Sequence, residues 1–365
     1  MSQRAPAPLP DVVQDVAPAA PRTDPPVRRG LLRRPGGRIA GVLVLVALIV
    51  VVCALSIAVG AKSIGLGTVW QAIVDPALQS NDAVIVRELR VPRTVLGVLV
   101  GLALGVGGAM MQGHTRNPLG DPGILGVAAG ASFAVVLAIT LLGVGSASGY
   151  VWFAFGGALL GSIAVFAIGS SGRGGATPVT LALAGTALSY LLYALVRAVL
   201  VTDQQTLESY RFWVVGALAG RDASIAWQVG PFIAIGLVLA MVNAPALNLL
   251  SLGDDVARGL GQRIWLARGT GVLVITVLTG AATAACGPIA FVGLVVPHIA
   301  RAITGPDHRW LVPYSGLIGV VMLVLADVIG RVVVRPGELQ VGIVLALVGA
   351  PFFVALIRRR KLASL

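Results

Sequence analysis

Charged residues are scarce in this sequence. Asp, Glu, Lys and Arg make up 12% of its 365 residues, hydrophobic residues make up 57%, and the mean hydropathy is +0.92. Soluble globular domains carry about 25% charged residues. The shortage excludes an ordinary soluble enzyme, a disordered chain and a coiled coil. It predicts an all-α membrane protein that crosses the bilayer several times.

Cysteine, histidine and lysine are also rare. Both cysteines, Cys53 and Cys286, lie in apolar segments, which excludes a disulfide framework. The three histidines have no metal-ligand spacing, so we expect no metal site and no cofactor. A phosphate-binding loop needs lysine after glycine, but the lysines here follow Ala61 and Arg360. Because no hydrolase motif is present either, the sequence predicts a protein that is not itself an enzyme.

Positive charge is concentrated at the two ends of the chain. Of the net charge of +12, residues 1–38 supply +4 through seven Arg and three Asp, and residues 358–361 supply another +4. Cations that flank apolar segments mark the cytoplasmic side of a membrane. We therefore expect both termini in the cytoplasm and no nucleic-acid partner. The Pro-, Ala- and Arg-rich residues 1–38 are expected to form a disordered cytoplasmic tail, followed by a membrane domain over residues 39–361.

Apolar segments divide this domain into ten expected transmembrane helices, and an even number agrees with two cytoplasmic termini. A helix needs about 20 apolar residues to cross the hydrocarbon core. The segment 122–172 suits two helices with a turn near residues 143–150. The segment 269–300 is expected to divide at Pro288, because proline ends or kinks a helix. The other segments cover residues 39–61, 94–115, 174–196, 223–253, 310–326 and 339–357.

Glycine is abundant, with 47 residues, and recurs at four-residue intervals. Gly97, Gly101 and Gly105 follow this spacing, as do the pairs 126/130 and 157/161. Residues four apart share one helix face, and a face without side chains lets two backbones approach closely. The spacing predicts tight helix–helix packing at these positions.

Few ionisable residues fall inside the expected helices. Asp327 and Arg331 lie four residues apart, so they share a helix face and are expected to pair. Arg87, Arg90 and Arg93 precede the second expected helix in an external loop, against the usual charge bias. Such a cluster is suited to docking an acidic partner, and anchoring to anionic lipid headgroups is the alternative.

Two polar segments are expected at the cytoplasmic side. Residues 117–122 form a turn between the second and third helices, and residues 248–261 follow the sixth helix. In the second segment, Asp254 or Asp255 is expected to cap a short helix. Its apolar face is expected to contain Val256, Ala257 and Leu260. A short amphipathic helix without catalytic residues indicates a docking element.

Taken together, these segments resemble the ABC importer permeases of the FecCD type, which serve iron-siderophore and vitamin B12 transport. The resemblance covers residues from about 40 to 361 and is carried by the order and spacing of several motifs. These are Arg90-Val91-Pro92-Arg93, Gln112, Arg116-Asn117-Pro118-Leu119, residues 121–126 with Gly130-Ala131, Leu183-Ala184-Gly185, residues 248–261 and 287–301, Asp307-His308-Arg309, Asp327 with Arg331, and Gly349-Ala350-Pro351-Phe352.

The resemblance implies a ten-helix subunit that pairs with a second permease subunit, identical or related, around a central path. It also implies two ATP-binding subunits on the cytoplasmic face, an extracytoplasmic substrate-binding protein, and a location in the lipid of the cytoplasmic membrane. The implied coupling segment runs from about residue 246 to 266. The residues that match family positions are Arg90, Arg93 and Arg331 for binding-protein docking, Asn117 and Leu119 for the inner gate, and Leu252, Gly253, Asp254, Asp255, Ala257, Leu260 and Gly261 for ATPase coupling.

The implied function is translocation of ferric siderophores, with ATP hydrolysed by a separate subunit. Vitamin B12, haem or another chelate are alternative cargoes, because an apolar path without metal ligands suits any of them. Pro178 and Val179 replace a hydroxyl-bearing pair of the vitamin B12 permease, and Gln340 departs from the family's Glu-x-Pro-x-Gly pattern. An ATP-independent secondary transporter is the alternative of another class, and the scarcity of intramembrane carboxylates counts against it.

Overall fold

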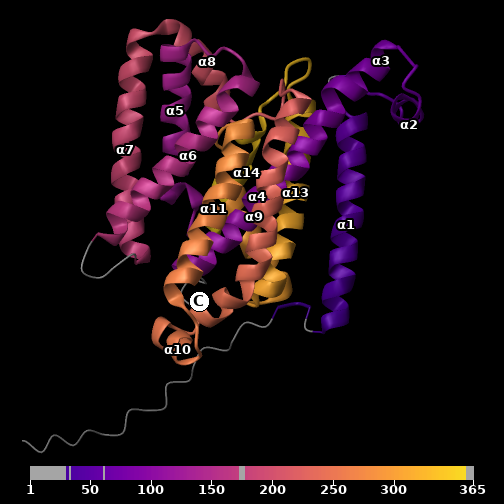
Figure 1. Ribbon diagram of the computed structural model, residues 1–365. Helices are drawn as coiled ribbons and strands as arrows, with labels where there is room; N and C mark the ends of the chain where they lie inside the picture. The colour runs from indigo at the N-terminus through magenta and orange to yellow at the C-terminus, as the bar shows by residue number, and fades with distance from the viewer. Residues whose placement is uncertain (1–29, 33, 61, 172–176, 359–365) are drawn as a thin grey trace, which may run out of the picture.

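The computed structural model describes residues 30–32, 34–60, 62–171 and 177–358, and within these ranges the chain is helical without a strand (Figure 1). The long helices are α1 (Pro35–Ala58), α4 (Val91–Thr115), α5 (Val127–Leu142), α6 (Ala147–Ser170), α7 (Pro178–Thr202), α9 (Ala223–Leu250), α11 (Ile264–Cys286), α12 (Val292–Thr304), α13 (His308–Val333) and α14 (Val341–Arg358). The short ones are α2 (Leu66–Val74), α3 (Asn81–Val84), η1 (Ile85–Arg90), η2 (Pro122–Leu125), α8 (Gln204–Val214) and α10 (Asp254–Gly259).

A helix forms in each of the eight apolar segments that the sequence predicts, and the segments 122–172 and 269–300 each contain two. Among the described residues, seven helical stretches are long and apolar enough to cross a membrane, and α5, α12 and α14 are shorter apolar helices. Both predicted divisions are confirmed. Gly143, with φ of +64°, ends α5 before α6 begins, and Gly287, with φ of +79°, ends α11 before α12 begins. Positive φ suits glycine because it has no Cβ.

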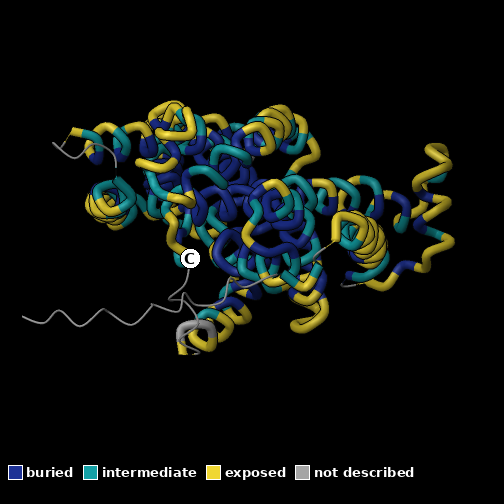
Figure 2. Tube along the Cα trace, turned by 90° about the horizontal axis from the view of Figure 1, so that it is seen from below, coloured by how far each residue is buried: buried dark blue, intermediate teal, exposed yellow. Residues whose placement is uncertain are grey.

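Four helices form the middle of the bundle. Helix α4 packs against α9, α11 and α13, while α5, α6 and α7 pack together on one flank and α1 lies against α13 on the other. Seen along the bundle, the buried residues gather in this middle and the flanking helices are exposed on their outer sides (Figure 2). Helix α4 therefore lies at the centre of the packing, and it connects the two polar ends described below.

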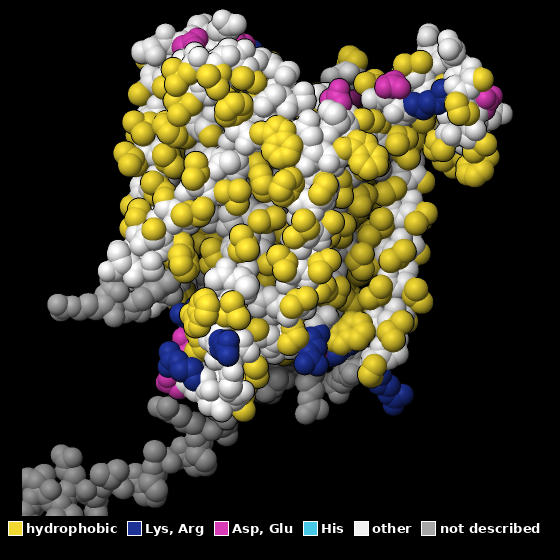
Figure 3. All heavy atoms as spheres, in the orientation of Figure 1, with side chains coloured by type: hydrophobic (Ala, Val, Ile, Leu, Met, Phe, Trp, Pro, Cys, Tyr) yellow, Lys and Arg dark blue, Asp and Glu magenta, His cyan; other side chains and the backbone are white. Residues whose placement is uncertain are grey.

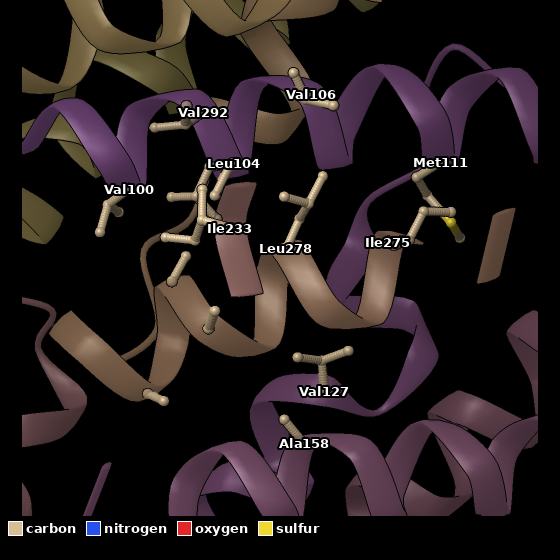
Figure 4. Packing of buried hydrophobic residues seen from close by; sticks show 14 of the residues in the cluster. Val100, Leu104, Val106, Met111, Val127, Ala158, Ile233, Ile275, Leu278 and Val292 are labelled. Atoms are coloured by element: carbon tan, nitrogen blue, oxygen red, sulfur yellow. The ribbon is translucent and has the colours of Figure 1, made fainter. Parts of the chain in front are cut away.

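Branched and unbranched aliphatic side chains fill the space around α4. Val100 and Val106 of α4, Ile233 of α9 and Leu278 of α11 are at most 1% exposed. Figure 4 shows Leu104 of α4 next to Ile233 and Leu278, whereas Val106 lies on another side of α4, where it faces Gly316 of α13. Such contacts stabilise the bundle through close packing, since lipid removes most of the hydrophobic driving force between helices.

The predicted glycine packing is confirmed. A Cβ added to Gly105 would lie 2.1 Å from the carbonyl oxygen of Ser315, and one added to Gly101 would lie 2.6 Å from the Cα of Val320, so α4 and α13 meet backbone to backbone. A Cβ on Gly130 of α5 would lie 2.2 Å from the carbonyl oxygen of Gly157 of α6. No side chain larger than hydrogen fits such distances without a shift of the backbone.

Several boundaries differ from the sequence-based expectation; α13, for example, continues to Val333, beyond the predicted end at residue 326. Helix α1 begins at Pro35, inside the predicted tail, because proline is favoured in the first turn of a helix. Of that tail, residues 1–29 and 33 lie outside the described residues, as do residues 359–361. Helix α7 continues to Thr202, beyond the predicted end at residue 196. The segment that carries Arg87 and Arg90 is helical rather than a loop, since η1 runs directly into α4.

The two ends of the bundle differ in character. Helices α2, α3 and α8 lie at one end, which we call the outer end, and α10 lies at the opposite, inner end (Figure 1). Lys and Arg side chains gather around α10 (Figure 3). Near α12, the N–H groups of Leu31 and Leu32 donate to the carbonyl oxygens of Ala302 and Ile303, which holds the start of the described chain at the inner end.

Candidate functional site

An ionic cluster at the outer end joins α1, α4 and α13. Asp327 of α13 is 1% exposed and accepts hydrogen bonds from two arginines. Arg93 Nη2 donates to its Oδ1 at 2.8 Å, and Arg331 Nη2 donates to its Oδ2 at 2.6 Å. The predicted pairing of Asp327 with Arg331 is thereby confirmed. A buried carboxylate shared by two guanidinium groups is a tightly held arrangement, because loss of Asp327 would leave the buried Arg331 without its carboxylate.

Two arginines of this cluster bind the carbonyl groups that end α1. Arg331 Nη1 donates to the carbonyl oxygen of Ser56 at 2.7 Å, and Arg90 Nη1 donates to those of Ile57 at 2.7 Å and Ala58 at 2.8 Å. The last carbonyls of a helix have no partner within the helix and carry partial negative charge. The two guanidinium groups therefore serve as a C-terminal cap for α1.

The three arginines that the resemblance assigns to docking thus lie in one region of the structure. They differ in burial and in whether their contacts reach the surface. Arg90 and Arg331 are buried, and their described contacts point into the protein. Arg93 Nη1 reaches outward to Glu338 Oε2 at 2.7 Å, and the Glu338 side chain is 34% exposed. Of the three, only Arg93 ends in an ion pair that reaches the surface in this conformation.

A pocket of about 200 Å³ opens beside that ion pair. Arg93 and Glu338 line it together with residues 217–219 and 339–341, which include Gln340. The segment after Glu338 is fixed to the bundle, because the N–H of Leu339 donates to the carbonyl oxygen of Gly330 at 2.9 Å. The outer end therefore has a mainly apolar recess with one charged wall, the Arg93–Glu338 pair.

At the inner end, Asn117 shapes the turn after α4. Its Oδ1 accepts from the N–H of Leu119 at 2.9 Å, and its carbonyl oxygen accepts from the N–H of Gly120 at 2.9 Å. His298 Nε2 of α12 donates to the carbonyl oxygen of Pro118 at 2.9 Å. Asn117 itself is exposed and Leu119 is half-buried. The two predicted gate residues therefore lie on a tight turn that α12 holds in place.

The short helix predicted in residues 248–261 is present as α10, but its N-terminus differs from the prediction. Gly253, with φ of +107°, is the N-cap, and no side chain caps it. Asp254 instead pairs with Arg116 of the turn after α4 and with Arg268 Nη2 of α11, the latter at 2.7 Å. The expectation that Asp254 or Asp255 caps this helix is wrong, because these two cations draw the Asp254 carboxylate away and Asp255 pairs with Arg258.

The apolar residues of α10 divide between the bundle and the surface. Ala257 is fully buried, whereas Val256 is 50% and Leu260 is 60% exposed. Leu252, just before the helix, is exposed as well. The predicted apolar face therefore packs only at Ala257 and leaves a small apolar surface at the inner end. Gly261, with φ of +83°, lies two residues after the helix ends.

Two further contacts were not predicted from the sequence. Asn248 of α9 donates through Nδ2 to Asp307 Oδ1 at 2.7 Å, and its Oδ1 accepts from the backbone N–H of His308 at 2.9 Å. This ties the segment before α10 to the start of α13.

At the start of α7, Pro178 lies in the first turn and Val179 is exposed. Neither side chain carries a hydroxyl. Among the described residues, no three His, Cys, Asp or Glu side chains gather as metal ligands would.

Known proteins are similar to this chain in both sequence and fold. A model of the FecCD transport family matches residues 48–359. The chain is 45% identical to the permease protein of the ferric enterobactin transport system of Escherichia coli (strain K12), over 88% of this chain and 96% of that protein. It is 43% identical to the permease protein of the iron(3+)-hydroxamate import system of Bacillus subtilis (strain 168), over 88% and 84%. A metal-chelate type ABC transporter solved in an inward-facing conformation superposes with a TM-score of 0.78 at 27% identity, over 88% of this chain and 99% of that one.

Proposed function

The chain belongs to the FecCD transport family, and on this premise we propose that it is the membrane-spanning permease subunit of an ABC importer for ferric siderophores. The observation that carries the proposal is the 45% identity to the ferric enterobactin permease along 96% of that protein. The hydroxamate permease, at 43% identity, supports the same class of cargo. The subunit would carry out no bond chemistry and would provide the path through the membrane.

The proposed topology has ten transmembrane helices and both termini in the cytoplasm. Each of the ten long helices would cross once, with α10 on the cytoplasmic side and α2, α3 and α8 outside. The cations around α10 support this orientation through the preference of Lys and Arg for the cytoplasmic side (Figure 3).

The proposed assembly contains a second permease subunit, two ATP-binding subunits and an extracytoplasmic binding protein. Docking of the binding protein would use the outer ionic cluster. Arg93 is the member best placed to meet an incoming carboxylate, which could replace Glu338 while Asp327 keeps its second partner, Arg331. Arg90 and Arg331 would act indirectly, by holding α1 under this surface.

ATPase coupling would use α10 and its flanking residues. The exposed Leu252, Val256 and Leu260 offer an apolar contact surface, and Asp254 would carry movement from α10 to the turn that contains Asn117 and Leu119. ATP binding next door would then bias the permease between two arrangements of its helices, open to opposite sides. Asn117 and Leu119 would close the path at its inner end.

Whole-cell uptake tests the cargo. Cells with and without the chain would be given iron-labelled ferric siderophores or labelled cobalamin, with ATP-depleted cells as the control. We expect loss of energy-dependent iron uptake alone when the chain is absent. Loss of cobalamin uptake alone would assign vitamin B12 as the cargo, and iron uptake that survives ATP depletion would favour a secondary transporter.

A further inference from the structure

A small helical flap projects from the outer end of the bundle. This outer flap, residues 62–90, comprises α2, α3 and η1, and it lies beyond α1 in both side and end views (Figures 1 and 2). Its own core consists of Ile64, Val69, Ala72, Ala83 and Val86. Arg87 fixes α2 to η1, since its Nε donates to the carbonyl oxygen of Ala72 at 2.5 Å and its Nη1 to that of Pro76 at 3.0 Å. The flap is therefore a folded unit with a defined orientation.

Helix α2 has a second apolar face that no described residue covers. Trp70 is 68% exposed, and Leu66, Ile73 and Val74 beside it are exposed too. At 3.6 residues per turn these four side chains share one arc, while Gly67, Thr68 and Gln71 fall outside it. The inward arc, with Val69 and Ala72, is already used by the flap's own core. The core of the flap does not use the exposed arc. These apolar side chains therefore need a different apolar environment.

The surroundings of this face are apolar. Every strongly exposed residue between positions 39 and 55 of α1 is apolar, so α1 turns a lipid-compatible surface outward along its length. In Figure 3 the apolar underside of the flap lies at the outer end of that surface, with charged side chains above it. The Lys62–Asp82 ion pair, 2.6 Å long, belongs to the charged part of the flap. The apolar arc of α2 thus continues the surface of α1, while the charges lie on the other side.

We propose that the exposed arc of α2 rests in the outer interfacial layer of the lipid bilayer, with Trp70 as its anchor. Amphipathic helices that lie in the membrane plane bury their apolar face among headgroups and the first acyl carbons, and Trp prefers this depth. Because Arg87 joins α2 to the segment that carries Arg90 and Arg93, the flap would set the height of the docking surface above the membrane. The inference rests on membrane insertion of the chain with α2 outside.

Fluorescent labelling tests this contact directly. In a background with Cys53→Ala and Cys286→Ala, Trp70→Cys and Gln71→Cys would each carry an environment-sensitive dye, in nanodiscs that contain lipid with a doxyl group on acyl carbon 5. Both positions are exposed on the same helix, so Gln71→Cys is the matched control. We expect several-fold stronger quenching and emission at shorter wavelength for the label at position 70.

Two results would overturn the proposal. Equal quenching at positions 70 and 71 would mean that α2 lies in water, and a label at position 70 that is shielded from water but not quenched would mean that a protein partner covers it. Reaction of the Gln71→Cys variant with a membrane-impermeant maleimide added outside the cell would show independently that α2 lies on the outer side of the membrane. An error in the topology and an absence of lipid contact would therefore give different results.

Discussion

Asp327 pairs with two arginines at once, and this sharing determines how the outer cluster responds to substitution. In Asp327→Asn, Arg93 and Arg331 lose their common carboxylate while Arg331 stays buried. Breaking a buried ion pair by removing one partner typically costs about 3–5 kcal/mol. We expect a drop of that order in the stability of the purified subunit, measured by thermal unfolding in detergent.

Glu338→Gln is the matched control for this loss. Its carboxylate pairs with the same Arg93 but is one-third exposed, and exposed pairs contribute about 0–1 kcal/mol. The variant should therefore unfold close to the parent. Equal destabilisation by the two substitutions would contradict the idea that Asp327 is the centre of the cluster.

Substitutions of Arg93 and Arg90 are expected to have different effects. The first should impair docking of the binding protein, and the second should lower the stability of the fold. Arg93→Ala removes the guanidinium that reaches the surface, yet leaves Asp327 paired with Arg331. We expect this variant to assemble normally and to lose most of the stimulation of ATP hydrolysis by the binding protein.

Arg90→Gln should instead lower stability, because it removes the guanidinium that donates to the Ile57 and Ala58 carbonyl groups. ATPase assays with and without binding protein, next to thermal unfolding, distinguish the two effects. Full stimulation of Arg93→Ala would reject the docking role.

At the scale of elements, α10 offers a compact test of coupling. Val256→Glu combined with Leu260→Glu places charge on the exposed apolar surface without disturbing the buried Ala257. An apolar contact with the ATP-binding subunit would then have to bury carboxylates without partners, which opposes association. We expect loss of co-purification of that subunit, whereas Val256→Ile with Leu260→Met should retain it. Unchanged co-purification of the charged variant would contradict the assignment.

The close helix contacts at glycine can also be tested by comparing a variant with a matched control. Gly105→Ala would place a methyl group 2.1 Å from the carbonyl oxygen of Ser315, whereas a Cβ at Gly156 of α6 meets nothing within 4 Å. Overpacking typically costs about 1–3 kcal/mol, and Ala is the better helix former in open space. We expect Gly105→Ala to melt at a lower temperature and Gly156→Ala to melt at or above the parent value. A parent-like Gly105→Ala would show that α4 and α13 can separate easily.

Sequence-based prediction succeeded where the signal is local in the chain, and it failed where the structure depends on contacts between residues that are distant in sequence. Apolar length, glycine spacing and Pro288 are local signals, and they correctly predicted a helix in each of the eight segments and both divisions. The prediction that Asp254 or Asp255 caps α10 is wrong because the partners of Asp254, Arg116 and Arg268, are distant in sequence and become neighbours only in the folded bundle. The burial of Arg90 was unpredictable for the same reason, since its partners are backbone carbonyls at the end of α1. The short helix α2 was missed because nine residues give too brief a pattern.

At the scale of the whole molecule, α1 and α7 are two little-buried spans, and they differ in what they expose. The outward surface of α1 is apolar, whereas α7 exposes Thr186 and Arg197. An arginine facing lipid is unfavourable, so α7 is the flank suited to a protein partner. We expect a label on Thr186→Cys to crosslink to the second permease subunit, and one on Val46→Cys of α1 to remain free of protein crosslinks. The opposite pattern would place the partner on α1.

The backbone contact between Gly105 and Ser315 also has a consequence for how sequences of this fold can vary. A clash between two side chains can be relieved by a smaller residue on either helix, so such positions can change in pairs. Here the obstructing atom is a carbonyl oxygen, which every amino acid has. No replacement at position 315 can make room for a side chain at position 105. Position 105 should therefore tolerate only glycine whatever its neighbour is, and an alignment of relatives should show it invariant and without a covarying partner.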